Sequence, residues 1–162
     1  MNKQADLLVM GGGSGGLAAA IRAARHSAKV VLFEPHELGG TCVNRGCVPK
    51  KAMWYAAELA QAQVMAQAVG FGVVPGKLDW SAFVAHREAY IARSRDSYAR
   101  RLHELGIEWV PQVAQFLDAH TLRAGDDEWR APHVLVATGA RPRELGIIGA
   151  EHTINSDDFF KL

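Results

Sequence analysis

The sequence predicts an α/β fold built on a parallel sheet, and three observations lead to this prediction. The chain of 162 residues is 49% hydrophobic and 22% charged, which gives enough apolar material for one domain core. Short apolar runs alternate with amphipathic or alanine-rich segments, an order typical of strands connected by helices. Half of the 16 glycines lie in the first 46 residues, and glycine this dense usually marks backbone that passes close to another group.

Composition excludes several classes of protein. A formal net charge of +1 argues against nucleic acid as a partner, because nucleic-acid binding demands a strongly basic face. The sequence has no apolar run of about 18 residues, so we expect no membrane span. Glycines interrupt the N-terminal apolar stretch, which argues against a signal peptide. Two cysteines are too few for a secreted disulfide scaffold, so we expect a cytoplasmic protein.

The first 34 residues predict a βαβ unit. Residues 6–10 and 29–33 are short apolar runs, which we expect to be buried strands. Between them, a glycine-rich turn leads into residues 17–26, whose alanines suit a helix packed closely on a sheet. Strand, turn, helix and strand within about 30 residues are typical of a parallel sheet.

The remaining sequence predicts a loop, two long helices and several short strands. We expect the loop over residues 35–46 and the helices over residues 50–69 and 79–105, the second ending at Gly106. Ser156 is the expected cap of a final helix. The expected strands cover residues 107–110, 113–117, 121–123 and 133–137, and residues 129–132 are ambiguous.

The glycine-rich turn contains a dinucleotide-binding motif. Gly11, Gly13 and Gly16 satisfy G-x-G-x-x-G. The first glycine permits a tight turn, the second lets backbone N–H groups approach a pyrophosphate, and the third allows close packing of helix on strand. Glu34 ends the second strand, where a carboxylate can bind an adenosine ribose with a free 2′-hydroxyl. The motif therefore predicts FAD or NAD rather than NADP; the alternatives are a flexible turn and a solvated acid.

Cys42 and Cys47 form the second candidate site. In an ideal helix, Cα atoms five residues apart lie about 8.6 Å from each other, whereas a disulfide needs about 4.4–6.8 Å. A bridge therefore requires the chain to bend, and Gly46 is where it could. If a helix begins near Pro49, its dipole and the lysines at 50 and 51 favour a thiolate at Cys47. Two cysteines lack the further ligands of a zinc site, so we expect no metal, and two unconnected thiols remain the alternative.

Four segments of the sequence carry a family resemblance. They are GGGSGG at 11–16, GGTCVNRGCVPKK at 39–51, Ala-Thr-Gly at 137–139 and SDDFF at 156–160. Together they resemble the pyridine nucleotide–disulfide oxidoreductase family, and within it the enzymes that reduce glutathione disulfide. The resemblance implies a Rossmann-like FAD-binding domain with a small antiparallel β-meander, an incomplete three-layer ββα domain. It assigns residues 1–143 to that domain and residues 144–162 to a connector toward an NADPH-binding domain.

The resemblance also implies roles for individual residues. Cys42 is the interchange thiol that attacks glutathione disulfide, Cys47 is the thiol beside the flavin, and Lys50 lies near the reactive nitrogen of the flavin. Ser14 and Tyr98 belong to the substrate site, although periodicity alone favours Tyr98 as a core residue. The implied FAD contacts are Gly11, Gly13, Ser14, Gly15, Gly16, Glu34, Thr41, Cys42, Lys50, Ala114, Thr138 and Gly139. Arg45 departs from the usual apolar residue between the cysteines; it either adds positive potential near the thiols or faces solvent.

The implied activity is the NADPH-dependent reduction of glutathione disulfide to two glutathiones by a homodimeric flavoenzyme. NADPH reduces FAD, FAD reduces the Cys42–Cys47 disulfide, and the two thiols reduce the substrate. The NADPH-binding domain and a catalytic His–Glu pair lie outside these 162 residues, so we expect no turnover from this segment alone. The alternatives are a reductase of trypanothione, dihydrolipoamide or mercuric ion, and an FAD-binding module without catalysis.

Overall fold

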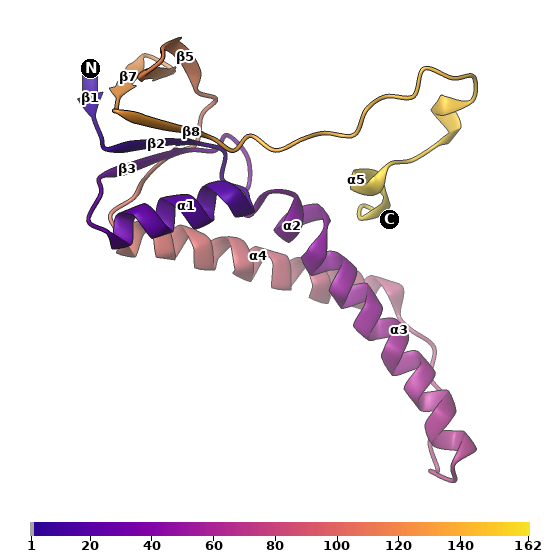
Figure 1. Cartoon of the computed structure of the whole chain (residues 1–162). Coiled ribbons are helices and arrows are strands. Elements are labelled where there is room, and N and C mark those ends of the chain that lie inside the picture. Colours follow the sequence, from indigo (N-terminus) through magenta and orange to yellow (C-terminus); the bar gives the residue numbers. More distant parts are fainter. Residues whose placement is uncertain (1) are drawn as a thin grey trace.

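The computed structural model describes residues 2–162, and its centre is a parallel sheet (Figure 1). The sheet contains β2 (Leu7–Met10), β3 (Val30–Phe33), β4 (Glu108–Val110) and β8 (His133–Val136), in the order β4-β3-β2-β8. Every neighbouring pair is parallel. The predicted α/β class with a parallel sheet is therefore confirmed.

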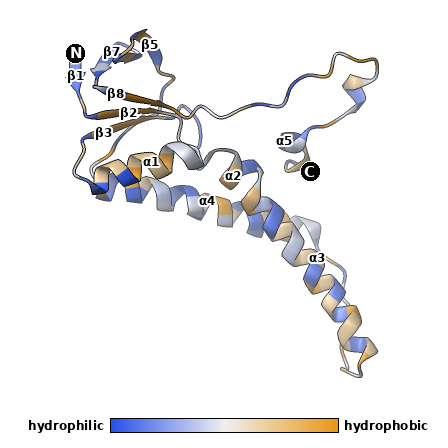
Figure 2. Cartoon of the chain, viewed as in Figure 1, coloured by the Kyte–Doolittle hydropathy of each residue, from blue (hydrophilic) through white to orange (hydrophobic). Residues whose placement is uncertain are grey.

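Both faces of the two central strands, β2 and β3, are covered, which explains why these strands are hydrophobic along their length (Figure 2). Side chains alternate between the two faces. On one face, Val30 and Leu32 pack with residues of α1 (Ser14–Arg25) and α4 (Trp80–Glu104). On the other, Val31 and Phe33 pack against a second sheet. All four β3 residues are consequently buried.

The second sheet contains β1 (Asn2–Gln4), β5 (Gln115–Asp118), β6 (Thr121–Ala124) and β7 (Asp127–Arg130), in the order β1-β7-β6-β5. Strands β5, β6 and β7 form the predicted antiparallel meander, and β1 pairs with β7 in parallel. Trp129 of β7 meets Phe33 edge to face, with ring centroids 5.1 Å apart. The layers are thus sheet, sheet and helix. Strand β1 was not predicted, because its hydrogen-bonding partner lies more than 100 residues further along the chain.

Two helices lie between β3 and α4 where one was predicted. The loop expected over residues 35–46 contains a short helix, α2 (Gly40–Arg45), so that prediction was wrong. Six residues are too few to show a helical period; burial of Val43 between neighbouring elements stabilises α2 instead. Helix α3 (Cys47–Ala68) begins three residues before the predicted start. Helix α3 and the first part of α4 extend away from the sheets, whereas the rest of α4 lies alongside α1 (Figure 1).

After β8 the chain continues without regular structure to a short 3₁₀ helix, η1 (Ala150–His152), and then to α5 (Ser156–Phe159). Ser156 was predicted to cap this last helix, but the cap is Asn155. The Asn155 side chain accepts hydrogen bonds from the backbone N–H groups of Asp157 and Asp158. Within residues 2–162, no helix has the length and hydropathy needed to cross a membrane.

Leu32→Ala should reduce the free energy of unfolding by about 2–5 kcal/mol, because Leu32 is 0% exposed between sheet and helices and its removal leaves a cavity. The matched control is Leu59→Ala on α3, where the side chain is 67% exposed and the expected change is within about 0.5 kcal/mol. Urea unfolding measures both. Equal losses for the two variants would contradict the described core.

Candidate functional site

A cavity of about 540 Å³ lies at the carboxyl ends of β2, β3 and β8. Its walls come from the turn after β2, the segment after β3, the α2–α3 junction and residues 137–140. The chain runs from β2 to β3 and β4 on one side of the sheet and returns to β8 on the other. Ligands of open α/β sheets bind at such a reversal of strand order.

Three glycines of the turn are required by the protein's own packing. Gly11 has φ of +107°, and a Cβ there would collide with the Ala137 carbonyl oxygen at the end of β8. A Cβ on Gly16 would collide with the Gly11 carbonyl oxygen, so α1 could not approach β2 as closely. A Cβ on Gly12 would lie 2.9 Å from the Glu34 side chain. The roles predicted for the first and third glycines of the motif agree with these contacts.

Gly13 and Gly15 differ from the other three glycines of the turn, because no atom of the protein would crowd a Cβ at either position. A Cβ on Gly13 would come no closer than 3.7 Å to Gly40 Cα, and a Cβ on Gly15 would meet nothing within 4 Å. Both residues line the cavity. Helix α1 begins beside them with no side-chain cap and no acidic residue in its first turn. Its first backbone N–H groups are therefore available to an anion.

Glu34 is held at the edge of the cavity by two backbone donors. Gly12 N–H donates to Oε2 at 2.8 Å, and His36 N–H donates to Oε1 at 2.9 Å. The carboxylate is thereby fixed where β3 ends, facing the same cavity as the glycine turn. Neither contact was predicted. Gly12 occupies a variable position of the motif, and only the fold brings it beside Glu34.

The chain bends at Gly46, as a contact between the two cysteines requires. Helix α2 ends at Arg45 and α3 begins at Cys47, with Gly46 outside helical geometry between them. A Cβ on Gly46 would lie 2.8 Å from the Thr41 carbonyl oxygen, so the bend leaves no room for a side chain. Both cysteines are free thiols, and both line the cavity.

The two thiols are close enough to influence one another's chemistry. Interaction with the Cys47 thiol raises the pKa of Cys42, and partial burial adds to this effect. A hydrogen bond with Ser14 acts in the opposite direction and lowers the pKa of Cys42. The start of α1 and the dithiol therefore meet at one point of the cavity.

The structure brings together most of the predicted site residues, but not all of them. Thr41, Thr138 and Gly139 line the main cavity; Ala114 lines an adjoining cavity of about 190 Å³ with Gly11 and Glu34. Lys50 is exposed in the first turn of α3, and Tyr98 packs against the core cluster under α1. Neither residue lines either cavity, and their roles stay predictions.

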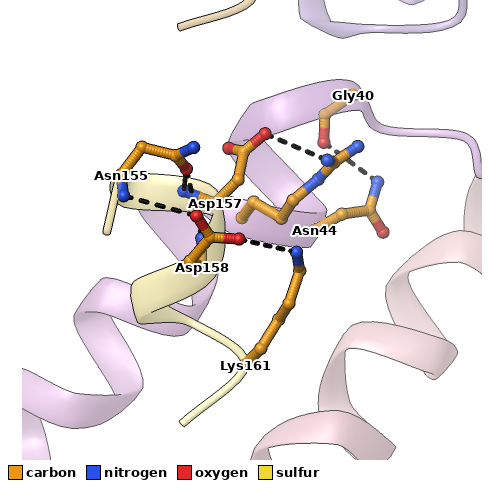
Figure 3. A network of polar contacts seen from close by, with 7 residues as sticks. Gly40, Asn44, Asn155, Asp157, Asp158 and Lys161 are labelled. Atoms are coloured by element: carbon orange, nitrogen blue, oxygen red, sulfur yellow. Dashed lines mark hydrogen bonds and ion pairs between the residues drawn. The ribbon is translucent and has the colours of Figure 1, made fainter. Parts of the chain in front are cut away.

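Asn44 is a structural element of the site that was not predicted from the sequence. Its side-chain amide donates to the Leu38 carbonyl oxygen at 3.2 Å, which holds α2 against the loop before it. The same amide donates to the Gly40 carbonyl oxygen at 2.9 Å, within α2 (Figure 3). Asn44 also lines the cavity. Its position between the cysteines was the available signal, but an asparagine in a predicted loop has no distinctive pattern.

Comparison with known proteins shows the family to which the chain belongs. A model described as pyridine nucleotide-disulphide oxidoreductase matches residues 5–161. The chain belongs to this family. Members of known name include the glutathione reductases of Yarrowia lipolytica (43% identical), Schizosaccharomyces pombe (42%) and a Nostoc species (38%). These matches cover 97–100% of the chain but 34–37% of the relatives. The chain therefore spans about a third of the length of these oxidoreductases.

Cys47→Ala should lower the pKa of Cys42, because it removes the partner that contributes most to raising it. More of Cys42 is then thiolate at a given pH, and its alkylation by iodoacetamide becomes faster and reaches half-maximal rate at lower pH. Mass spectrometry of the labelled site, across the neutral and alkaline range, measures the change. Lys51→Ala, on the exposed side of α3, is the control and should leave the profile unchanged. An unchanged profile for Cys47→Ala would contradict the described interaction.

Proposed function

We propose that the complete protein is an FAD-dependent oxidoreductase that uses NADPH to reduce glutathione disulfide, and that this chain supplies the flavin-binding and dithiol part. The observation that carries the proposal is that one cavity is lined both by the glycine turn with Glu34 and by Cys42 and Cys47. A dinucleotide site alone fits many enzymes, whereas a dithiol in the same cavity favours redox chemistry at sulfur, of which thiol–disulfide exchange is the commonest form. The names of the relatives support glutathione disulfide as the substrate.

The residues of the cavity fit FAD. The start of α1 offers unpaired N–H groups to a pyrophosphate, and Gly13 and Gly15 leave room for its approach. Glu34 is placed to accept hydrogen bonds from a ribose, and its backbone donors hold it in that position. Thr41, Thr138 and Gly139 complete the walls, and the volume lies within the range of cofactor sites. Residues 1–143 then form the FAD-binding domain, and residues 144–162 lead toward the NADPH-binding domain.

Bound FAD supplies two-electron transfer between NADPH and the disulfide. The protein's own thiols then carry out exchange in two steps. Cys42 Sγ, as thiolate, attacks one sulfur of glutathione disulfide; the substrate S–S bond breaks, a mixed disulfide forms, and one glutathione thiolate leaves and takes up a proton. Cys47 Sγ attacks Cys42 Sγ, which restores the Cys42–Cys47 disulfide and releases the second glutathione.

The raised pKa of Cys42 means that this thiol needs a proton acceptor before it attacks. Ser14 assists, because its hydrogen bond lowers that pKa. We assign the proton acceptor to a group that the partner subunit supplies in the homodimer that the family resemblance implies. We also propose that Lys50 lies beside the reactive flavin nitrogen and that Tyr98 contacts the disulfide substrate, as the family resemblance implies.

Cys42→Ser in the complete protein should reduce NADPH-dependent glutathione disulfide reduction by about a thousandfold or more, the order of loss that follows removal of a nucleophile. The visible absorbance of bound FAD should remain, because the glycine turn and Glu34 are untouched. Ser97→Ala, on the exposed side of α4, is the control and should keep full activity. Absence of flavin from the wild-type protein, or undiminished turnover by Cys42→Ser, would contradict the proposed function.

The substrate is tested by parallel assays of the wild-type protein with glutathione disulfide, trypanothione disulfide, lipoamide and mercuric ion. We expect the highest kcat/KM with glutathione disulfide. A higher value for another acceptor would keep the dithiol chemistry and overturn the assigned substrate.

A further inference from the structure

The segment between the two cysteines is joined to the far end of the described chain. Arg45, the last residue of α2, lies with Nη1 3.0 Å from Oδ2 of Asp157 in α5. The two residues are 112 positions apart in the sequence. Arg45 also lines the cavity that holds both thiols. The sequence predicted that Arg45 either adds positive charge beside the thiols or faces solvent; neither prediction contains an ion pair with Asp157.

The hydrogen bonds within α5 leave the Asp157 carboxylate available for Arg45 (Figure 3). The Asn155 side chain accepts from the N–H groups of Asp157 (2.8 Å) and Asp158 (3.2 Å). The Asp158 carboxylate accepts from Asn155 N–H and pairs with Lys161 at 2.9 Å, which lowers the pKa of Asp158. Asp158 is thus engaged within its own helix, and Asp157 is directed to α2.

A second arginine holds the other end of α5. Arg87 of α4 is 4% exposed; its Nη2 donates to the Phe160 carbonyl oxygen at 3.0 Å, and its Nε donates to Glu88 at 3.0 Å. Without the Phe160 carbonyl, Nη2 of this buried guanidinium would lose its hydrogen-bond acceptor, which is costly for a buried donor. Helix α5 is therefore fixed at two points, one on α4 and one on α2.

Helix α2 is held from both sides. Asn44 binds it to the preceding loop through the Leu38 carbonyl, and Arg45 binds it to α5 through the Asp157 carboxylate. Since α2 contains Cys42 and ends at the Gly46 bend, these contacts determine where the Cys42 thiol lies relative to Cys47. A dithiol held in this way loses less conformational freedom when it closes to a disulfide.

We propose that Arg45 is a positioning residue for the dithiol, acting through its ion pair with Asp157. The pair holds α2 against α5 and so favours the Cys42–Cys47 disulfide over the open dithiol. The inference rests on the proposed function, because it requires that these cysteines form a redox couple. Arg45 neither attacks the substrate nor contacts the reacting sulfurs in this account; it acts through the placement of α2.

The test measures the Cys42–Cys47 couple of the complete protein in a glutathione redox buffer. In this equilibrium the protein disulfide takes two electrons from two glutathiones; its S–S bond breaks, the S–S bond of glutathione disulfide forms, and two protons pass to the protein thiols. Acid quenching, alkylation and mass spectrometry give the dithiol fraction. Arg45→Met and Asp157→Asn should each shift the equilibrium about twofold to fivefold toward the dithiol, which corresponds to about 9–21 mV.

The direction of the two shifts separates positioning from simple charge. If charge alone acted, Asp157→Asn would leave a free cation that favours thiolates, whereas Arg45→Met would remove that cation and favour the disulfide. A positioning role predicts that both single variants shift the equilibrium in the same direction, toward the dithiol. It also predicts that the double variant Arg45→Met/Asp157→Asn shifts no further than either single variant, and that the exchanged pair Arg45→Asp/Asp157→Arg returns toward wild type. Arg22→Met, an exposed arginine of α1, is the matched control and should leave the equilibrium unchanged.

Thermal unfolding of each variant checks that the fold is retained. Single variants that leave the couple unchanged, that shift it in opposite directions, or whose effects add in the double variant would overturn the inference and leave the proposed function standing. A wild-type protein whose cysteines do not interconvert between dithiol and disulfide would overturn the proposed function and this inference with it.

Discussion

The contact on which the site depends most is the approach of the glycine turn to the end of β8. Gly11 meets the Ala137 carbonyl so closely that only a residue without Cβ fits, and Gly16 meets Gly11 in the same way. Gly11 N–H donates to the Phe33 carbonyl, and Ala137 N–H donates to the Met10 carbonyl, both at 2.8 Å. The carboxyl ends of three parallel strands are thereby fixed side by side, and α1 begins at this same end of the sheet. The position of the cavity follows from this arrangement.

A second constraint places the two cysteine thiols in that cavity. The bend at Gly46, closed against the Thr41 carbonyl, separates α2 from α3 and turns Cys42 toward Cys47. Ser14, at the start of α1, contributes to the hydrogen bonding of Cys42. The glycine turn and the dithiol are therefore one structural unit, because the helix that begins at the turn also supplies the Ser14 side chain to the Cys42 thiol.

The sequence predicted those parts of the fold that depend on residues close together in the chain. Apolar runs at the β2 and β3 positions predicted buried strands because both faces of these strands are covered. The spacing of Gly11, Gly13 and Gly16 predicted the turn, and close packing in the structure explains Gly11 and Gly16. Long-range contacts could not be predicted. Strand β1 forms on β7, α2 depends on the burial of Val43, and Asp157 reaches Arg45 from the other end of the chain. Tyr98 matched a family position, yet its periodicity agrees with the packed place it occupies in the structure.

The central claim is that a flavin and the Cys42–Cys47 pair share one cavity and exchange electrons. Anaerobic reductive titration of the complete FAD-bound protein tests it most directly, because each redox group takes up two electrons. The account predicts uptake of about four electrons per flavin, with both cysteines becoming open to alkylation during the titration. Uptake of about two electrons per flavin, with the reactivity of the cysteines unchanged throughout, would contradict it.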